Sequence, residues 1–418
     1  MRERRLLVVV ACLALLPSCK RATPSAGAPA TQGPAEVRIG ATLPLTGSES
    51  RIGGFYKEGY ELAIEEQNRA GGVDVGGVRM PVKLTLLDDT STQATAVSLA
   101  DRLVNSDKVA FLLGTYSSHL VEAQSVVAEQ NGVPYVNGGG GAVHIYKRGF
   151  KWLFGLLAPV EDLAAAQMAF IDARQKEGKL PRPARIALLW ENTAHGTDYR
   201  TGVKRFVEQH PADYTIAVDD SFELNGKDFG ALLGKVKNAK VDLFLADAHL
   251  PDYITLQRQY VTLGLCHKVQ SYGARGSEKQ AADALGKEQV GYILSAVWWN
   301  NQLGASGLTR HFVEAFKAGH GGRLPEWYQA LGYETARALL LAIEKAGSLD
   351  RDKVRAALAA LDAESILPGG HLSFPAGSGQ QALYPFVVQQ NQPDGTSPIV
   401  WPKDAATSAG VVPNPACP

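Results

Sequence analysis

Two groups of residues in the first third of the chain have the types and spacing to bind a small anion. Ser117 and Ser118 stand at the predicted start of a helix, and Asn137 followed by four glycines at 138–141 ends the next predicted strand. A helix N-terminus offers unpaired N–H groups and a positive dipole end, and a bare backbone loop allows close approach. The alternative is that a serine only caps the helix and the glycines only turn. Each glycine loses more backbone entropy on folding than another residue would. Four consecutive glycines are therefore more than a single turn requires.

These residues lie in one predicted β-α-β unit. The short apolar run at 109–113 is typical of a buried strand. Apolar side chains then recur at helical spacing until Asn131 and Gly132 end the helix, and a second strand follows at 133–136. In an open parallel sheet the loops after the strands lie at the carboxyl edge, where ligands bind. We therefore expect the serines and the glycine loop to be neighbours.

Strands and helices alternate over most of the chain. Further predicted strands lie at 37–41, 82–87, 185–190, 214–218, 241–246 and 269–272, each followed by a helical pattern or a loop. A long apolar strand at 292–298 departs from this rhythm, because three helices follow it between 309 and 361 with no strand among them. Two consecutive runs of β-α units predict an α/β fold with two doubly wound domains of parallel sheet.

The first 18 residues predict a signal peptide. Three arginines precede an apolar run at 6–16, which is too short to span a bilayer. The run ends in Leu16-Pro17-Ser18-Cys19, which resembles a bacterial lipobox with a less usual proline, so the mature protein would begin at Cys19 and carry lipid there. The alternative is cleavage by a different signal peptidase. Residues 19–35, rich in Ala, Pro, Gly, Thr and Ser, would form the lipidated N-terminus and a flexible tether.

Charge and cysteine content narrow the class of protein. Removing residues 1–18 takes three Arg and one Glu from totals of 42 basic and 42 acidic residues, which leaves 39 and 41 and a net charge near −2. This balance excludes a nucleic-acid electrostatic footprint. No later apolar run is long enough for a membrane span. Besides Cys12 and Cys19 only Cys266 and Cys417 remain, and these could pair in an oxidising periplasm or stay as free thiols.

Short motifs along nearly the whole predicted mature chain suggest a family. They are Pro44-Leu45-Thr46-Gly47, the segment EEQNRAGG at 65–72, Leu87-Asp88-Asp89, Gly114 with Ser117-Ser118, Gly332-Tyr333-Glu334-Thr335 and the segment 370–374. Together they resemble the leucine/isoleucine/valine-binding protein family, which are type I periplasmic solute-binding proteins of ABC importers. The resemblance implies two α/β lobes joined by three crossovers, which close on a small ligand by hinge motion.

The resemblance also implies lobe boundaries. Lobe 1 would comprise 36–156 with 298–374, lobe 2 would comprise 157–297 with 375–410, and 411–418 would be a tail. The three-helix run would then return to lobe 1 before the chain visits lobe 2 again.

The family's ligand contacts can be carried over residue by residue. In amino-acid-binding members the ligand carboxylate lies at a serine-containing helix start and against the backbone of the next strand's loop. The corresponding residues here are Tyr116, Ser117 and Ser118, then Asn137, Gly139, Gly140 and Gly141. The ammonium of such a ligand is held by a hydroxyl in the second loop and by a carboxylate from lobe 2.

The chain departs from the family at the ammonium end. The hydroxyl position falls on Gly141, the lobe-2 acid position near Arg275, the lobe-2 aromatic positions on His195 and His249, and the first-loop aromatic position on Ile52 beside Arg51. Burying an ammonium without a partner is costly, whereas Arg275 offers a planar fork suited to a carboxylate. We therefore predict that the ligand is a small anion or an amide-like polar molecule and not an α-amino acid.

Several of these assignments have alternatives. Asp247 would restore the missing negative charge if it turned inward, Arg275 could be a solvated loop arginine, and His195 and His249 could be ordinary loop histidines. Trp298 and Trp299 could line the cleft or pack in the core, and core packing is favoured for at least one of them.

No enzyme signature is present in the sequence. HExxH, CxxC, a Walker A lysine loop and GxSxG are all absent, and Ser118-His119 is sequence adjacency and not a catalytic triad. We predict a monomeric solute-binding lipoprotein without metal or cofactor, anchored by lipid at the periplasmic or outer membrane surface. It would capture its ligand between the lobes and deliver it to the permease of an ABC importer. A ligand-sensing receptor without a transport role is the alternative, and an enzyme is a further one.

Overall fold

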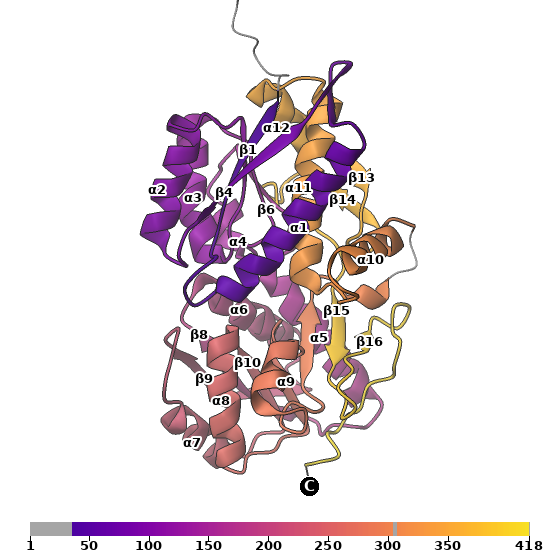
Figure 1. The fold of residues 1–418 in the computed structure, drawn as a ribbon. Coiled ribbons are helices and arrows are strands. Elements are labelled where there is room, and N and C mark those ends of the chain that lie inside the picture. The colour runs from indigo at the N-terminus through magenta and orange to yellow at the C-terminus, as the bar shows by residue number, and fades with distance from the viewer. Residues whose placement is uncertain (1–35, 304–306, 418) are drawn as a thin grey trace, which may run out of the picture. The chain divides into compact units, whose positions relative to one another are not determined.

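The computed structural model describes residues 36–303 and 307–417, which form two α/β lobes (Figure 1). The predicted signal peptide, Cys19 and the tether lie outside the described residues. Each lobe has a sheet of mainly parallel strands with helices against it. The predicted α/β fold with two doubly wound lobes is confirmed.

The lobe 1 sheet has the strand order β4-β1-β5-β6-β7, and all its pairings are parallel. Its strands are β1 (Val37–Leu43), β4 (Val82–Asp88), β5 (Phe111–Leu113), β6 (Tyr135–Asn137) and β7 (Leu153–Gly155). A short antiparallel hairpin of β2 (Val73–Val75) and β3 (Val78–Met80) was not expected. The order in the sheet brings the loops after β5 and β6 side by side, as the sequence predicts.

Lobe 1 is completed by helices from distant parts of the chain. They are α1 (Ser50–Arg69), α2 (Gln93–Asn105), α3 (Ser118–Asn131), α4 (Val143–Tyr146), α10 (Gly307–Gly319), α11 (Trp327–Ala346) and α12 (Arg351–Ala359). In Figure 1 the orange α11 lies along the indigo α1. A Cβ on Gly59 would lie 2.4 Å from the carbonyl oxygen of Gln329, so this glycine allows the two helices to touch.

The lobe 2 sheet has the strand order β16-β15-β12-β11-β10-β8-β9. Its strands are β8 (Ala184–Glu191), β9 (Tyr214–Phe222), β10 (Leu243–Asp247), β11 (Val269–Tyr272), β12 (Leu294–Val297), β15 (Val387–Gln390) and β16 (Ile399–Trp401). Its helices are α5 (Val160–Lys176), α6 (Ala194–Gln209), α7 (Gly230–Ala239), α8 (Leu250–Thr262) and α9 (Lys279–Leu285). The prediction of a parallel sheet needs one correction, because β15 and β16 are antiparallel additions at one edge.

The path of the chain agrees with the prediction that it crosses between the two lobes more than once. After β12 a short 3₁₀ helix η1 (Asn301–Leu303) precedes α10–α12, and the antiparallel pair β13 (Asp362–Glu364) and β14 (His371–Ser373) follows them. The chain then supplies β15 and β16 to the lobe 2 sheet. The lobe boundaries at 156/157, 297/298 and 374/375 stay predictions.

A disulfide bond joins Cys266 and Cys417, with their Cα atoms 5.3 Å apart. The sequence left open whether these cysteines pair. The bond closes a loop with a sequence separation of 151 residues and ties the C-terminal segment to the end of lobe 2 that follows α8. Such a bond persists in an oxidising compartment.

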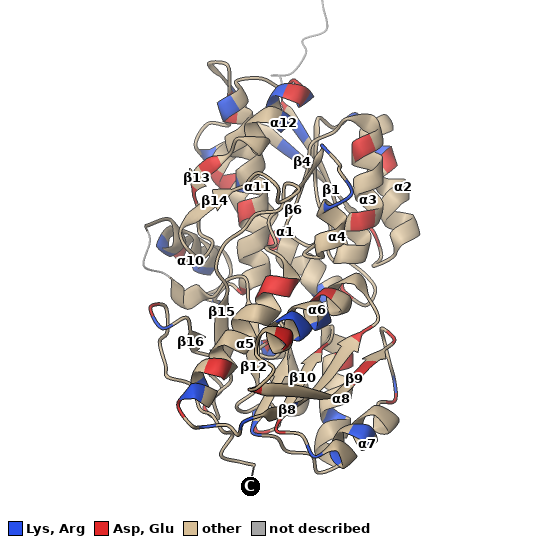
Figure 2. Cartoon of the chain, turned by 180° about the vertical axis from the view of Figure 1, so that it is seen from behind, with Lys and Arg blue, Asp and Glu red and all other residues tan. Residues whose placement is uncertain are grey.

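Acidic and basic residues are interspersed on the helices of both lobes (Figure 2). Among the described residues, no helix combines the length and the apolar character needed to cross a membrane.

Candidate ligand-binding site

The first half of the site is the start of α3 in lobe 1. Ser117 is the residue before the helix, but its hydroxyl does not cap the helix and lies 2.9 Å from His119 Nδ1. The backbone N–H groups of Leu120 and Val121 donate to the carbonyl of Ser117. Those of Ser118 and His119 have no partner among the residues that the structure describes. Two N–H groups at a positive helix end are therefore free to meet an anion.

The glycine loop after β6 packs directly against this helix start. A Cβ on Gly139 would lie 2.1 Å from the carbonyl oxygen of Thr115, and one on Gly140 would lie 2.9 Å from Val121 Cβ. The Ser118 hydroxyl accepts from the N–H of Gly141 at 3.2 Å. Close packing of two loops thus accounts for these glycines, and ligand approach is not needed to explain them.

The loop uses several of its own hydrogen-bonding groups internally. Asn137 Oδ1 accepts from the N–H of Gly140 at 3.0 Å, and the Ser118 hydroxyl also accepts from the N–H of Ala142 at 3.4 Å. Among the predicted loop contacts, the N–H of Gly139 has no partner among the described residues. Asn137, Gly140 and Gly141 consequently hold the loop in place, and Gly139 is the glycine whose N–H is available.

The second half of the site contains two histidines that are each held by a carboxylate in lobe 2. His195, in the first turn of α6, places Nδ1 2.8 Å from Asp247 Oδ2. His249, at the start of α8, places Nδ1 2.6 Å from Glu191 Oε2. All four side chains are buried, and the Nε2 atoms of both rings have no partner among the described residues. Two buried imidazoles with fixed rings and free Nε2 atoms are not ordinary loop histidines.

The charge on His249 is stabilised by its partner. Burial opposes the charged imidazole, but the charge and hydrogen bond of Glu191 outweigh burial and raise the pKa of His249 to about 9. The reciprocal effect lowers the pKa of Glu191 to about 2, although burial acts against it. At neutral pH His249 therefore presents an N–H donor at Nε2. His119 on lobe 1 differs, because burial and the nearby charge of His249 lower its pKa to about 4.

Asp247 turns inward and is 1% exposed, which is the arrangement that the alternative prediction required. One of its oxygens, Oδ2, is taken by His195. The other, Oδ1, has no partner among the described residues and lies next to Gly273, where an added Cβ would be 2.3 Å away. Glu191 was not predicted as a site residue and Asp247 only as an alternative source of negative charge, but each is the last residue of a buried strand, β8 or β10. A carboxylate at the carboxyl end of a parallel strand was the signal that could have found them.

Arg275 reaches from lobe 2 to lobe 1. Its Nη2 donates to the hydroxyl of Tyr116, and its Cζ lies 5.9, 5.6 and 5.9 Å from the ring centres of Tyr116, Trp327 and Tyr328. Its Nε lies 3.4 Å from Glu278 Oε1. The residue is 3% exposed, so the alternative of a solvated loop arginine is wrong. Its Nη1 has no partner among the described residues, which leaves a donor for a ligand.

The first-loop residues lie differently from the prediction. Helix α1 begins at Ser50, so Arg51 and Ile52 belong to its first turn and not to a loop. Ile52 is 3% exposed and packs in the hydrophobic core. Arg51 is exposed, with Cζ 5.7 Å from the Phe55 ring, and lines a cavity at the edge of the site.

Both tryptophans after β12 are buried. Trp298 Nε1 donates to the carbonyl of Ala158 at 2.8 Å, and its ring lies 6.3 Å from His195. Trp299 Nε1 donates to the carbonyl of Ile366 at 3.0 Å. Trp298 thus borders the histidines, and both pack in the core as the sequence favours for at least one.

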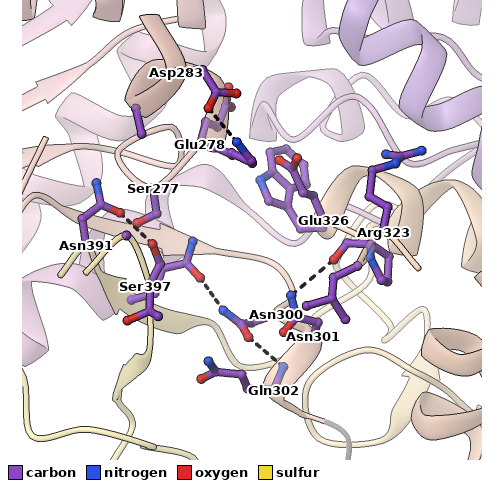
Figure 3. Close-up of a pocket in the computed structure, with 18 of the residues that line it drawn as sticks. Ser277, Glu278, Asp283, Asn300, Asn301, Gln302, Arg323, Glu326, Asn391 and Ser397 are labelled. Carbon is purple, nitrogen blue, oxygen red and sulfur yellow. Dashed lines mark hydrogen bonds and ion pairs between the residues drawn. The ribbon is translucent and has the colours of Figure 1, made fainter. Parts of the chain in front are cut away.

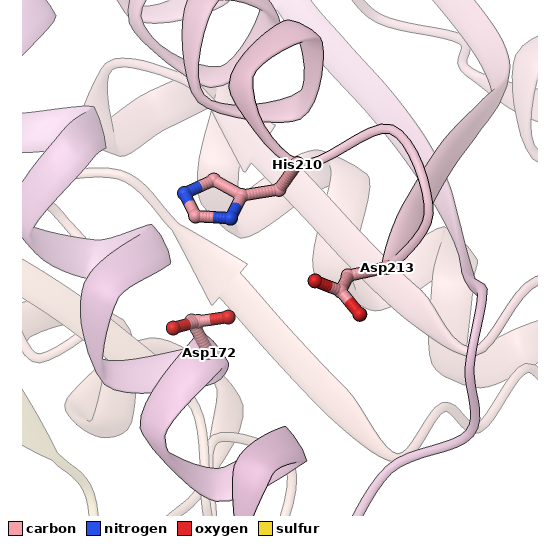
Figure 4. Close-up of side chains that lie close together, drawn as sticks. All are labelled: Asp172, His210 and Asp213. Atoms are coloured by element: carbon pink, nitrogen blue, oxygen red, sulfur yellow. The ribbon is translucent and has the colours of Figure 1, made fainter.

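Two groups of side chains have donors close enough to hold a metal ion. One is Asp172, His210 and Asp213 on the outer part of lobe 2 (Figure 4). There Lys176 Nζ lies 2.6 Å from Asp172 Oδ2, and the Tyr214 hydroxyl donates to Oδ1, so both oxygens of Asp172 are already engaged. The other is Glu191, His195 and Asp247, in which Glu191 Oε2 and Asp247 Oδ2 already bind the two histidines.

A cavity of about 1050 Å³ lies beside the buried site (Figure 3). Its lining comes from both lobes and includes Arg51. In Figure 3, Arg323 lies across the cavity from Glu278 and Asp283. The guanidinium of Arg275 lies behind Glu278, next to the rings of Trp327 and Tyr328.

Comparison with known proteins assigns the chain to a family. A model of the periplasmic binding protein family matches residues 36–396. The chain belongs to the periplasmic binding protein family. As a member of this family of solute-binding proteins it is not an enzyme.

Relatives of this periplasmic binding protein agree with the assignment. The chain is 26% identical over 378 residues to Leu/Ile/Val-binding protein homolog 8 of Brucella abortus (strain 2308), covering 89% of this chain and 92% of that relative. The structure is similar to a leucine binding protein LivK from Thermotoga maritima (TM-score 0.76, 23% identity, 91% and 99% of the two chains). It is also similar to a solute binding protein from R. palustris in complex with benzoate (TM-score 0.73, 20% identity, 92% and 99%).

Proposed function

We propose that this periplasmic binding protein captures a small anion between its lobes and delivers it to the permease of an ABC importer. The observation that carries the proposal is Arg275, a buried guanidinium that joins the lobes and retains a free Nη1. Glu278 is the counter-ion of Arg275, but Nη1 lacks an acceptor, and an unpaired buried donor is costly, so a ligand acceptor would complete the site.

The electrostatics of the surrounding residues favour an anion over an ammonium. The N-termini of α3, α6 and α8 carry Ser118, His195 and His249, and the dipole of each helix adds positive potential there. Charged His249 adds a further donor. The carboxylates of Glu191 and Asp247 are engaged by the two histidines. An α-ammonium group would therefore meet the positive potential of Arg275, charged His249 and the helix ends, against one unpaired oxygen of Asp247.

We assign the ligand contacts to both lobes. On lobe 1 the anion would meet the N–H groups of Ser118, His119 and Gly139, beside Ser117 and the ring of Tyr116. On lobe 2 it would meet Arg275 and the Nε2–H of charged His249, with the His195 ring 6.2 Å from that of His249. Arg51 would act only at the rim.

The ligands named for two similar structures are a carboxylate without an amine and an amino acid. The R. palustris protein is in complex with benzoate, a carboxylate that has no amine. The T. maritima protein is a leucine binding protein, and leucine has both groups. Binding of a branched-chain amino acid is therefore the second candidate, and the positive charges of Arg275 and His249 at this site speak against it.

The proposal extends to the N-terminus. Leu16-Pro17-Ser18-Cys19 supports a lipid anchor on Cys19 after removal of residues 1–18. The mature protein would then be a monomer held at the membrane surface, where it meets the permease. A sensor that hands its closed form to another partner would use the same site.

A thermal-shift screen of amino acids, aliphatic and aromatic carboxylates, and amides tests the ligand class. A ligand that binds the native state alone raises the melting temperature. We expect the largest increases from carboxylates without an amine. Large increases from leucine, isoleucine or valine together with none from such carboxylates would contradict the proposal.

Calorimetry of Arg275→Ala with the best carboxylate tests the contact itself. Loss of a charged hydrogen bond in a buried site should weaken binding by about 100-fold. Arg205→Ala, at an exposed ion pair with Glu161 in the same lobe, is the control and should bind normally. Unchanged affinity in Arg275→Ala would remove Arg275 from the site.

A further inference from the structure

The cavity beside the site exposes two buried polar atoms that the described residues leave unsatisfied. Glu278 Oε2 is an acceptor and Trp327 Nε1 is a donor, and neither has a hydrogen-bond partner in the described part of the chain. Glu278 is 4% exposed and Trp327 is 5% exposed, and both line the cavity. Buried polar groups are normally paired, so each unpaired atom at a cavity wall indicates a missing partner.

Both side chains are held in place by the rest of the wall. Glu278 Oε1 accepts from the hydroxyl of Tyr328 and faces Arg275 Nε. The Trp327 ring stacks on Tyr328 with ring centres 3.6 Å apart and lies 4.9 Å from the Trp298 ring. The free oxygen and the free N–H are therefore presented by fixed groups, which reduces the entropy lost on binding.

Several other polar side chains of the cavity lining pair with one another or with a neighbour. Asn300 Nδ2 donates to Gln389 Oε1, and Lys279 Nζ lies 2.6 Å from Asp283 Oδ1 (Figure 3). Arg323 pairs with Glu58. The unpaired acceptor and donor of Glu278 and Trp327 thus stand out from the remaining lining.

We infer that this cavity binds a carboxamide or ureido group of the ligand. Its N–H would donate to Glu278 Oε2, and its carbonyl oxygen would accept from Trp327 Nε1. An ammonium would satisfy Glu278 alone, a carboxylate would be repelled by Glu278, and a methyl group would leave both atoms unpaired. The ligand class becomes a carboxylate that carries an amide or urea group. The inference rests on the proposed function, because the carboxylate would bind at Arg275, whose Nε lies 3.4 Å from Glu278 Oε1.

Calorimetry of the mature chain with matched ligands tests this inference. The test ligands are succinamate and glutaramate, with counterparts of equal chain length that end in a methyl, an ammonium or a second carboxylate group. Burial raises the pKa of Glu278 to about 7, so the titrations are made at a pH above about 8, where its carboxylate is charged. We expect an amide-ended ligand to bind at least tenfold more tightly there than its methyl-ended counterpart, since a hydrogen bond to a charged group is worth about that factor. Equal affinities of the two in the wild-type protein would overturn the inference.

Two variants test whether Glu278 and Trp327 are the residues that bind the amide group. Glu278→Gln and Trp327→Phe should each weaken the amide-ended ligand by about tenfold and leave the methyl-ended ligand within about twofold. Asp283→Asn removes an equivalent charge from the rim of the same cavity and should change neither ligand. If Glu278→Gln weakened both ligands equally, the residue would not recognise the amide.

Different results would contradict the proposed anion site and the proposed amide-binding cavity. Carboxylates that bind without a preference for the amide end would overturn this inference and leave the anion site intact. Absence of binding by every carboxylate would overturn the proposed anion site, and this inference with it. Because the wild-type comparison needs no variant, a variant that does not fold leaves the test decisive.

Discussion

The two halves of the site are built from different chemistry. The lobe 1 half is mostly backbone: the start of α3 and a glycine loop that packs against it through Ser118 and Asn137. The lobe 2 half is made of ionisable side chains, with His195 and His249 each fixed by a buried carboxylate. A backbone half suits any ligand with a suitable anionic group, whereas a side-chain half distinguishes one ligand from another. We therefore expect changes in lobe 1 to act through packing and stability, and changes in lobe 2 to act through charge.

Breaking the buried pair of Glu191 and His249 should have the largest effect on stability. Glu191→Gln leaves His249 without its counter-charge in a buried site, and we expect a loss of roughly 3 kcal/mol in the free energy of unfolding. Urea denaturation measures this loss. Asp220→Asn, at a partly exposed pair with Lys235, should cost less than about 1 kcal/mol. Equal effects of the two substitutions would mean that the buried pair is not special.

The contribution of the same pair should depend on pH. The native pKa of His249, about 9, is above its unfolded value of 6.5, so its stabilisation is present below pH 6.5 and lost as the pH rises through 9. The native pKa of Glu191, about 2, is below its unfolded value of 4.5, so its stabilisation is present above pH 4.5 and lost as the pH falls through 2. The stability difference between wild type and Glu191→Gln should thus be greatest between pH 4.5 and 6.5. A difference that does not shrink by pH 9 to 10 would argue against a charged His249.

Crowding the glycine loop tests the lobe 1 half. The added Cβ of Gly139→Ala would lie 2.1 Å from the Thr115 carbonyl oxygen, so we expect a loss of about 1–3 kcal/mol in the free energy of unfolding. Gly54→Ala is the control, because nothing lies within 4 Å of its Cβ position in α1. That substitution should be neutral or slightly stabilising. Thermal unfolding of the two variants decides whether packing explains the glycine.

Removing the Ser118 hydroxyl should have the smallest effect. Ser118→Ala takes away the acceptor for the N–H groups of Gly141 and Ala142, which costs about 1 kcal/mol of stability. Ligand preference should not change, because the hydroxyl is engaged within lobe 1. A calorimetric panel in which Ser118→Ala altered the ranking of carboxylates and amides would show that lobe 1 also contributes to specificity.

Much of the site could be predicted from local pattern. The loops after β5 and β6, and the placement of His195, His249 and Arg275 in loops at the ends of strands, follow from the alternation of strands and helices. The start of α1 was misplaced, because its first turn has a polar and glycine-containing sequence, and this put Arg51 and Ile52 in a loop. Glu191 was missed, and Asp247 was considered only as an alternative, because a charged residue at a strand end is normally solvated. Their burial depends on partners more than 50 residues away.

The sequence by itself determined the features that depend on neighbouring residues. These are the signal-peptide and lipobox pattern, the α/β alternation, the helix start at Ser117–Ser118 and the glycine loop. Backbone periodicity and local turn chemistry are short-range properties, so they can be read along the chain. Only the tertiary structure decided which charges meet: Arg275 with Tyr116, 159 residues apart, each histidine with its carboxylate, and Cys266 with Cys417. Those pairings depend on burial and on contacts between distant segments, which no local pattern specifies.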